Sequence, residues 1–101
     1  MSNFIRVAAL NEIPEDTGRR VEVDGQEIAL FRQGSAVFAL YNVCPHAGGP
    51  LAEGGIREGS VICPWHGWEF QLKTGACSFN PSIKQPVFKV KVENGEVFVQ
   101  A

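Results

Sequence analysis

Two short cysteine–histidine pairs constrain this chain more than any other feature of its sequence. The first lies in Cys44-Pro45-His46 and the second in Cys63-Pro64-Trp65-His66, with sixteen residues between them. The whole chain has three cysteines and two histidines, so both histidines and two of the cysteines fall in these segments. Each segment offers one thiolate and one imidazole within a few residues. We interpret the two segments as loops that close over one metal centre.

The length and the net charge of the chain limit the number of domains and the kinds of partner. A length of 101 residues is typical of one domain, here 1–101, with the metal-binding loops at about 42–70. The formal net charge is −2 and the nine Lys and Arg are scattered, which argues against nucleic acid as a partner. A modest core in so small a domain often benefits from a metal.

The sequence also predicts a cellular location. Residues 1–6 show no cationic segment followed by a long apolar run, so no secretory signal is expected. No apolar stretch approaches the roughly 18 residues that a membrane span requires, so no membrane contact is expected. An odd number of cysteines suits a reduced protein better than a disulfide scaffold. Together these features predict a cytoplasmic protein.

Alternating apolar residues and frequent turns predict an all-β antiparallel fold of about nine short strands. Asp24-Gly25 and Asn94-Gly95 are strong hairpin signals, because both central residues of the favoured turn need positive φ. No segment has the periodicity of an amphipathic helix. The expected strands are 4–10, 19–23, 28–31, 36–41, 60–63, 67–72, 87–92 and 96–100, and after Thr74-Gly75 the chain turns into a further short segment at 76–79.

Three kinds of site are compatible with the four candidate ligands. Two loops that each supply one Cys and one His satisfy a binuclear [2Fe–2S] cluster, which needs two ligands per iron. A structural zinc is the alternative, although zinc modules usually pair Cys with Cys and His with His at short spacing. Nucleophilic catalysis by a Cys beside a His is disfavoured, because no third group is evident to orient the histidine.

The two loops resemble the signature of the Rieske family, Cys-x-His followed further along by Cys-x-x-His. The resemblance continues through His66-Gly67-Trp68-Glu69-Phe70 and Thr74-Gly75, and the strand pattern fits the length of a small Rieske ferredoxin. It implies a Rieske-type antiparallel β-sandwich with a two-loop cluster-binding subdomain. It further implies that Cys44 and Cys63 hold one iron and that His46 and His66 hold the other.

Departures from the family pattern bear on the redox potential expected for the cluster. High-potential members have an additional cysteine in each loop, joined as a disulfide, and the matching positions here are Gly49 and Trp65. Those members also carry hydroxyl groups where this chain has Trp68 and Phe70. Fewer hydrogen bonds to sulfur leave the reduced cluster less stabilised, so a low potential within the Rieske range is expected.

The resemblance implies an electron carrier that is not an enzyme on its own. The chain has no further histidines for the mononuclear iron site of an oxygenase, and it lacks the Gly-x-Gly-x-x-Gly fingerprint for a dinucleotide. Two sets of partners fit: a flavoprotein reductase with a terminal oxygenase that hydroxylates rings, or the large subunit of an assimilatory NAD(P)H nitrite reductase. The run 44–54 is more similar to the nitrite reductase type.

Two residues near the loops have simpler roles. Cys77 is expected to be a small buried apolar residue without a ligand role. Trp65, which lies between two candidate ligands, is expected on an apolar rim around the metal centre.

Overall fold

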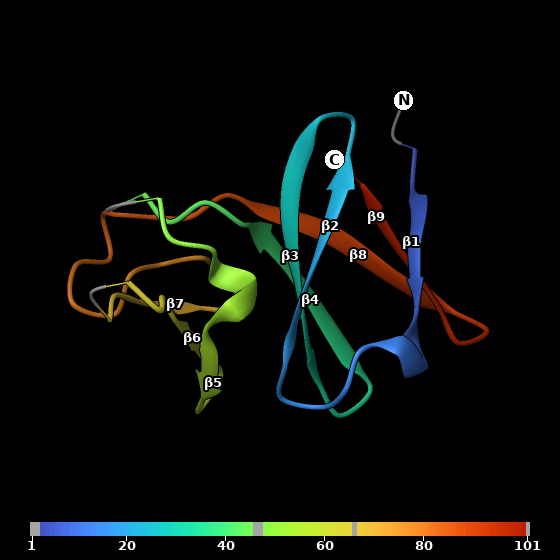
Figure 1. Cartoon of the computed structure of the whole chain (residues 1–101), viewed down its shortest axis with the longest axis horizontal. Coiled ribbons are helices and arrows are strands. Elements are labelled where there is room, and N and C mark those ends of the chain that lie inside the picture. Colours follow the sequence, from blue (N-terminus) through green and yellow to red (C-terminus); the bar gives the residue numbers. More distant parts are fainter. Residues whose placement is uncertain (1–2, 46–47, 66, 101) are drawn as a thin grey trace.

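The computed structural model describes residues 3–45, 48–65 and 67–100, and their regular structure is β-strand apart from two single-turn 3-10 helices, η1 (Leu10–Glu12) and η2 (Leu51–Glu53). Every strand pair is antiparallel. A six-stranded sheet has the order β1-β9-β8-β4-β3-β2, and a three-stranded sheet has the order β5-β6-β7 (Figure 1). The bounds are β1 (Ile5–Ala9), β2 (Gly18–Val23), β3 (Gln26–Gln33), β4 (Ala36–Tyr41), β5 (Gly55–Arg57), β6 (Ser60–Ile62), β7 (Glu69–Gln71), β8 (Val87–Glu93) and β9 (Glu96–Gln100).

Two tight hairpins set the register of the larger sheet. Asp24 and Gly25 have φ of 50° and 80° between β2 and β3, and Asn94 and Gly95 have φ of 52° and 75° between β8 and β9. These are the positive values that the turns were expected to need, because the twist of such a turn matches that of the strands. Both predicted hairpins are confirmed.

Strand β3 is buried on both faces and therefore joins the two parts of the molecule. Ile28 and Leu30 point into one hydrophobic cluster, while Ala29 and Phe31 point into another, and all four are fully buried. Side chains alternate across a strand, so this continuous apolar run serves both cores. The sheet core consists of Ala8, Ile13, Val23, Ile28, Leu30, Val37, Ala39, Val97 and Val99. The loop core consists of Ala29, Phe31, Leu40, Cys44, Leu51, Val61, Cys63, Phe70, Leu72 and Cys77.

The loop core lies between the six-stranded sheet and a smaller unit made of β5, β6, β7 and the loops around them. In Figure 1 this unit lies to the left of the larger sheet, and β1 and β9 lie on the far side of that sheet. Both cysteine loops belong to it, so the expected β-sandwich with a separate two-loop subdomain is confirmed. In the described part of the chain no helix is long and apolar enough to cross a lipid bilayer.

The structure differs from the predicted strands in two places. Residues 76–79 form only isolated bridges, Phe70 with Cys77 and Ala76 with Lys84, because the N–H of Cys77 donates to the carbonyl of Ile83 in the loop that follows. Strand β5 was missed in the sequence because it begins at Gly55, and glycine is depleted in strands.

Candidate metal centre

Each cysteine closes its own loop with two backbone hydrogen bonds. The N–H of Cys44 donates to the carbonyl of Gly49 at 2.9 Å, and the carbonyl of Cys44 accepts from the N–H of Gly48 at 2.9 Å. In the second loop the N–H of Cys63 donates to the carbonyl of Trp68 at 2.7 Å, and its carbonyl accepts from the N–H of Gly67 at 3.2 Å. Each cysteine thus has its backbone fixed by the loop that it begins.

The two loops repeat one geometry. In both, the cysteine carbonyl accepts from a glycine four residues later, and the cysteine N–H donates to the carbonyl five residues later. The two glycines, Gly48 and Gly67, have φ of 79° and 73°, a region that side chains other than glycine rarely adopt. The signal was present in the sequence as a glycine four residues after each candidate ligand cysteine, and the sequence reasoning overlooked it.

The loops bring the two cysteine thiols together inside the loop core. Cys44 is 2% exposed and Cys63 is 1% exposed, although their loops are far apart in sequence. Burial raises the pKa of the Cys63 thiol, and the neighbouring Cys44 thiol raises it further. Two buried thiolates side by side need a cation to compensate their charge. This donor pair therefore fits the soft half of a metal or iron–sulfur site.

The close approach of the loops explains why residue 49 is glycine. A Cβ built on Gly49 would lie 2.7 Å from Cys63 Sγ and 3.0 Å from Trp65 Cγ. That same Cβ would lie 3.1 Å from Trp65 Cβ, so positions 49 and 65 are neighbours. These are the positions where high-potential relatives of the Rieske type were expected to carry a disulfide. In this chain the Trp65 side chain packs against Gly49 instead.

The other two candidate ligands, His46 and His66, lie outside the described residues. Within the described ranges no three His, Cys, Asp or Glu side chains are close enough to hold a metal ion. The structure thus brings together Cys44 and Cys63 and leaves the histidine half of the predicted ligand set untested. Cys77 is 1% exposed and lies in the same loop core, as expected for a small buried residue.

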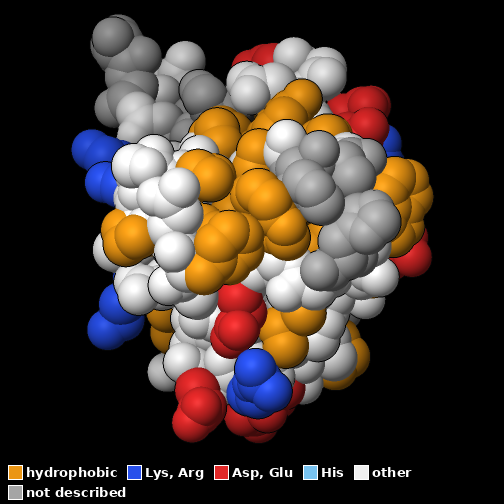
Figure 2. Space-filling view, turned by 90° about the vertical axis from the view of Figure 1, so that its left-hand side faces the viewer, with side chains coloured by type: hydrophobic (Ala, Val, Ile, Leu, Met, Phe, Trp, Pro, Cys, Tyr) orange, Lys and Arg blue, Asp and Glu red, His pale blue; other side chains and the backbone are white. Residues whose placement is uncertain are grey.

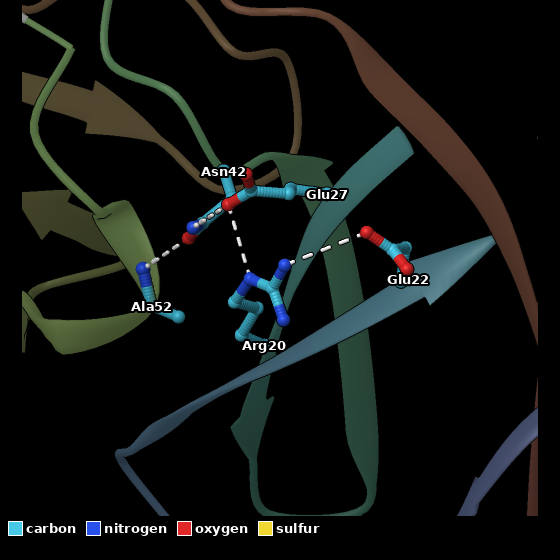
Figure 3. Close-up of polar contacts among 5 residues, drawn as sticks. All are labelled: Arg20, Glu22, Glu27, Asn42 and Ala52. Atoms are coloured by element: carbon cyan, nitrogen blue, oxygen red, sulfur yellow. Dashed lines mark hydrogen bonds and ion pairs between the residues drawn. The ribbon is translucent and has the colours of Figure 1, made fainter. Parts of the chain in front are cut away.

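Asn42 ties the first loop to the larger sheet (Figure 3). Its Oδ1 accepts from the N–H of Ala52 at 2.8 Å, and its Nδ2 donates to Glu27 Oε1 at 3.2 Å. The Arg20 guanidinium also donates to Glu27 Oε1, at 3.0 Å. The hydrogen bond from Arg20, followed by that from Asn42, holds the pKa of the Glu27 carboxyl below its usual value. The contact between Glu27 and its two donors therefore stabilises the folded state near neutral pH. This stabilisation is lost as the pH falls through the lowered pKa of Glu27.

Exposed aromatic side chains lie beside the loops, in segments without charged residues. Trp65 is 50% exposed, as expected for a rim residue, and Phe79 is 63% exposed. The rings of Phe79 and Trp68 pack edge to face with centroids 4.8 Å apart. Segments 44–52, 63–68 and 76–83 contain no Asp, Glu, Lys or Arg, although 20% of the chain is charged. Figure 2 shows apolar side chains gathered on the upper and middle part of this face, with acidic and basic side chains directly below them.

Comparisons with known proteins agree with this geometry. A ferredoxin component of the naphthalene 1,2-dioxygenase/salicylate 5-hydroxylase systems of a Ralstonia species is 32% identical over 99 residues, which cover 97% of this chain and 95% of that protein. A solved structure described as an NADH-dependent nitrite reductase small subunit from Mycobacterium tuberculosis is 28% identical, with a TM-score of 0.90 and coverage of 100% and 96%. A chain in the solved complex of reduced oxygenase and oxidized ferredoxin in carbazole 1,9a-dioxygenase is 32% identical, with a TM-score of 0.87 and coverage of 96% and 92%.

The same domain also occurs within longer proteins. Human apoptosis-inducing factor 3 is 33% identical over 96 residues, which are 94% of this chain but only 16% of that protein. The chain therefore spans about a sixth of the length of that relative. The family model for the Rieske [2Fe-2S] domain matches residues 3–97. With nearly its whole length matched, and with two cysteine loops of like geometry, this chain belongs to the Rieske [2Fe–2S] family.

Proposed function

We propose that the chain is a one-electron carrier whose [2Fe–2S] cluster is held by Cys44 and Cys63 on one iron and by His46 and His66 on the other. The observation that carries the proposal is the contact of two buried thiols delivered by loops of matching geometry. Such a cluster accepts and releases single electrons without making bonds to a substrate. The carrier is a single domain over 1–101, with cluster-binding loops at about 42–70, and it works in the cytoplasm.

The protein residues have a limited task in this function. The loop backbones fix the two cysteines, and the loop core keeps water away from their sulfur atoms. The apolar face around Trp65 and Phe79 faces the redox partner. The similarity to ferredoxin components and to a nitrite reductase small subunit supports a role as a carrier or as a non-catalytic subunit.

Two sets of partners fit the proposed carrier. One is a flavoprotein reductase together with a terminal oxygenase, supported by the similarity to dioxygenase ferredoxins. The other is the large subunit of a nitrite reductase, supported by the structural similarity to a nitrite reductase small subunit. Reduction of the purified carrier by each candidate reductase, followed by electron delivery to oxygenase or nitrite reductase, separates them. Turnover with one system and none with the other names the partner, and turnover with neither contradicts both assignments.

The midpoint potential is expected near the low end of the Rieske range, roughly −150 mV. Phe70 is fully buried and Trp68 is half-buried beside it, and neither side chain carries a hydroxyl group to bond to sulfur. Hydrogen bonds to sulfur stabilise the more negative reduced cluster, so their loss lowers the potential. A redox titration followed by visible absorption measures it, and a clearly positive midpoint would contradict this reading.

Docking of the partner is expected to depend on apolar contact rather than on ion pairs. The variants Trp65→Ser and Phe79→Ser should slow electron delivery to the partner, because both remove exposed apolar area beside the loops. Raising the ionic strength from about 0.1 to about 1 M should change the wild-type rate constant little, since segments 44–52, 63–68 and 76–83 contain no charged side chains to screen.

The control is Val92→Ser, which removes another exposed apolar side chain (37% exposed) from β8 near the distant Asn94-Gly95 turn. It should leave the rate unchanged. A rate constant that falls about 10-fold or more with salt, as steered association does, would show that charges outside this face guide docking.

A further inference from the structure

The ladder between β4 and β8 is interrupted where it approaches the first cysteine loop. Ala39 pairs with Phe88 and Leu40 pairs with Val87. One step further, the N–H of Tyr41 donates to the carbonyl of Pro86 at 2.9 Å. In an antiparallel ladder this pair should exchange both hydrogen bonds, but proline has no N–H to return. The Tyr41 carbonyl therefore has no ladder partner.

The side chain of Gln85 supplies the missing donor. Its Nε2 donates to the carbonyl of Tyr41 at 2.5 Å and to the carbonyl of Val43 at 2.6 Å. Gln85 is 2% exposed, so these bonds form away from water, where an unpaired carbonyl is costly. A primary amide has two protons, and both are used. Val43 directly precedes Cys44, so Gln85 fixes the backbone that enters the first loop.

The backbone of Gln85 reaches toward the second loop. Its N–H donates to the carbonyl of Gly75 at 2.8 Å, and the N–H of Gly75 donates to the carbonyl of Gln71 at 2.8 Å. Gln71 is the last residue of β7, the strand that follows the second cysteine loop. Gly75 has φ of 76°, and a Cβ there would collide with the Gln85 carbonyl oxygen. Gln85 is therefore bonded directly to the backbone that enters the first loop, and through Gly75 to the end of the strand that leaves the second.

We propose that Gln85 is a positioning residue that sets the first cysteine loop against the second by replacing the hydrogen bond that Pro86 cannot donate. The inference rests on the proposed function only in that the positioned cysteines hold the cluster. Loss of the two donors from Gln85 leaves the 41–43 backbone free to shift, and Cys44 shifts with it. Residues that orient metal ligands in this way typically change metal retention by about 10- to 100-fold when they are removed.

The test compares three variants of the full chain. Gln85→Met keeps the length of the side chain and removes both donors. Gln85→Met/Pro86→Ala returns one donor, because the N–H of residue 86 faces the Tyr41 carbonyl in this register. Gln26→Met is the control, since Gln26 is exposed at the start of β3, beside the Asp24-Gly25 turn. Two readouts are used: the rate at which a chelator bleaches the iron–sulfur absorbance, and the amide hydrogen exchange of Cys44 in metal-free protein.

We expect Gln85→Met to lose the cluster at least about 10-fold faster than wild type and to exchange the Cys44 amide faster. The Pro86→Ala change should recover part of both effects, which a loss of packing alone would not permit. A folded Gln85→Met variant with unchanged bleaching and exchange overturns the inference, as does a double variant without recovery. Should Gln85→Met not fold, recovery of folding in the double variant supports the inference and its failure overturns it. Wild-type protein without iron and sulfide instead overturns the proposed function, while the exchange measurement still decides the role of Gln85.

Discussion

Replacing Cys44 or Cys63 by alanine is expected to abolish iron binding and the visible absorbance, whereas Cys77→Ala should retain both. All three cysteines are almost fully buried, at 2%, 1% and 1% exposure, and all three belong to the loop core. The three cysteines are thus matched in burial and in packing, and they differ only in the proposed role of Cys44 and Cys63 as ligands. Each substitution removes a similar small side chain from the core, so the loss of packing should be similar in all three variants. Any additional loss of stability in Cys44→Ala and Cys63→Ala would come from the missing cluster.

Iron content and the visible spectrum of the three purified variants measure this difference. The expected result is colourless protein for Cys44→Ala and Cys63→Ala and coloured protein for Cys77→Ala. Far-ultraviolet circular dichroism shows whether each variant retains its β structure. A folded Cys44→Ala variant that keeps a wild-type spectrum would remove Cys44 from the ligand set.

Gly49→Ala should have the second-largest effect, by forcing the two loops apart. The added Cβ would lie 2.7 Å from Cys63 Sγ, closer than real Cβ atoms approach a neighbour, so a loop must shift. Overpacking of a buried site typically costs about 1–3 kcal/mol. Because the displaced neighbour is a proposed ligand, we expect the holoprotein to lose its cluster faster as well as to unfold at a lower temperature.

Gly55→Ala is the matched control for this prediction. Gly55 begins β5, is exposed, and has no atom within 4 Å of an added Cβ. Alanine loses less conformational freedom on folding than glycine, so this change should be neutral or slightly stabilising. Thermal unfolding and chelator bleaching of both variants provide the comparison. Equal behaviour of the two alanine variants would mean that the loops adapt to the added methyl group without consequence for the site.

Much of the fold could be predicted because local residues determine it. Asp24-Gly25 and Asn94-Gly95 specify their turns through backbone conformation, and the turns in turn set the strand register. The run from Ile28 to Phe31 indicated a strand, but not that it would be buried on both faces and join two cores. That property depends on the packing of the small subdomain against β3, which no local pattern records.

The cysteines of the candidate site could be predicted from the sequence, but the residues that hold the loop backbone in place could not. The spacing of Cys44 and Cys63 pointed to two loops, and the structure brings their thiols together. Gln85 and Asn42 lie outside both motifs. Gln85 donates to the carbonyls of Tyr41 and Val43, and Asn42 accepts from the N–H of Ala52, so both bind backbone atoms of residues that are distant from them in sequence. Such bonds depend on which carbonyls and amides lack a partner in the folded chain, and only tertiary structure reveals them.

The central claim is that this chain carries a binuclear iron–sulfur cluster with mixed sulfur and nitrogen ligands. Its most direct test is the metal and sulfide content of protein purified without oxygen, together with the EPR spectrum after reduction. We predict about two iron atoms and about two acid-labile sulfides per chain, with the EPR signal of a Rieske centre. A colourless protein with one zinc ion and no sulfide would contradict the account and favour a structural zinc domain.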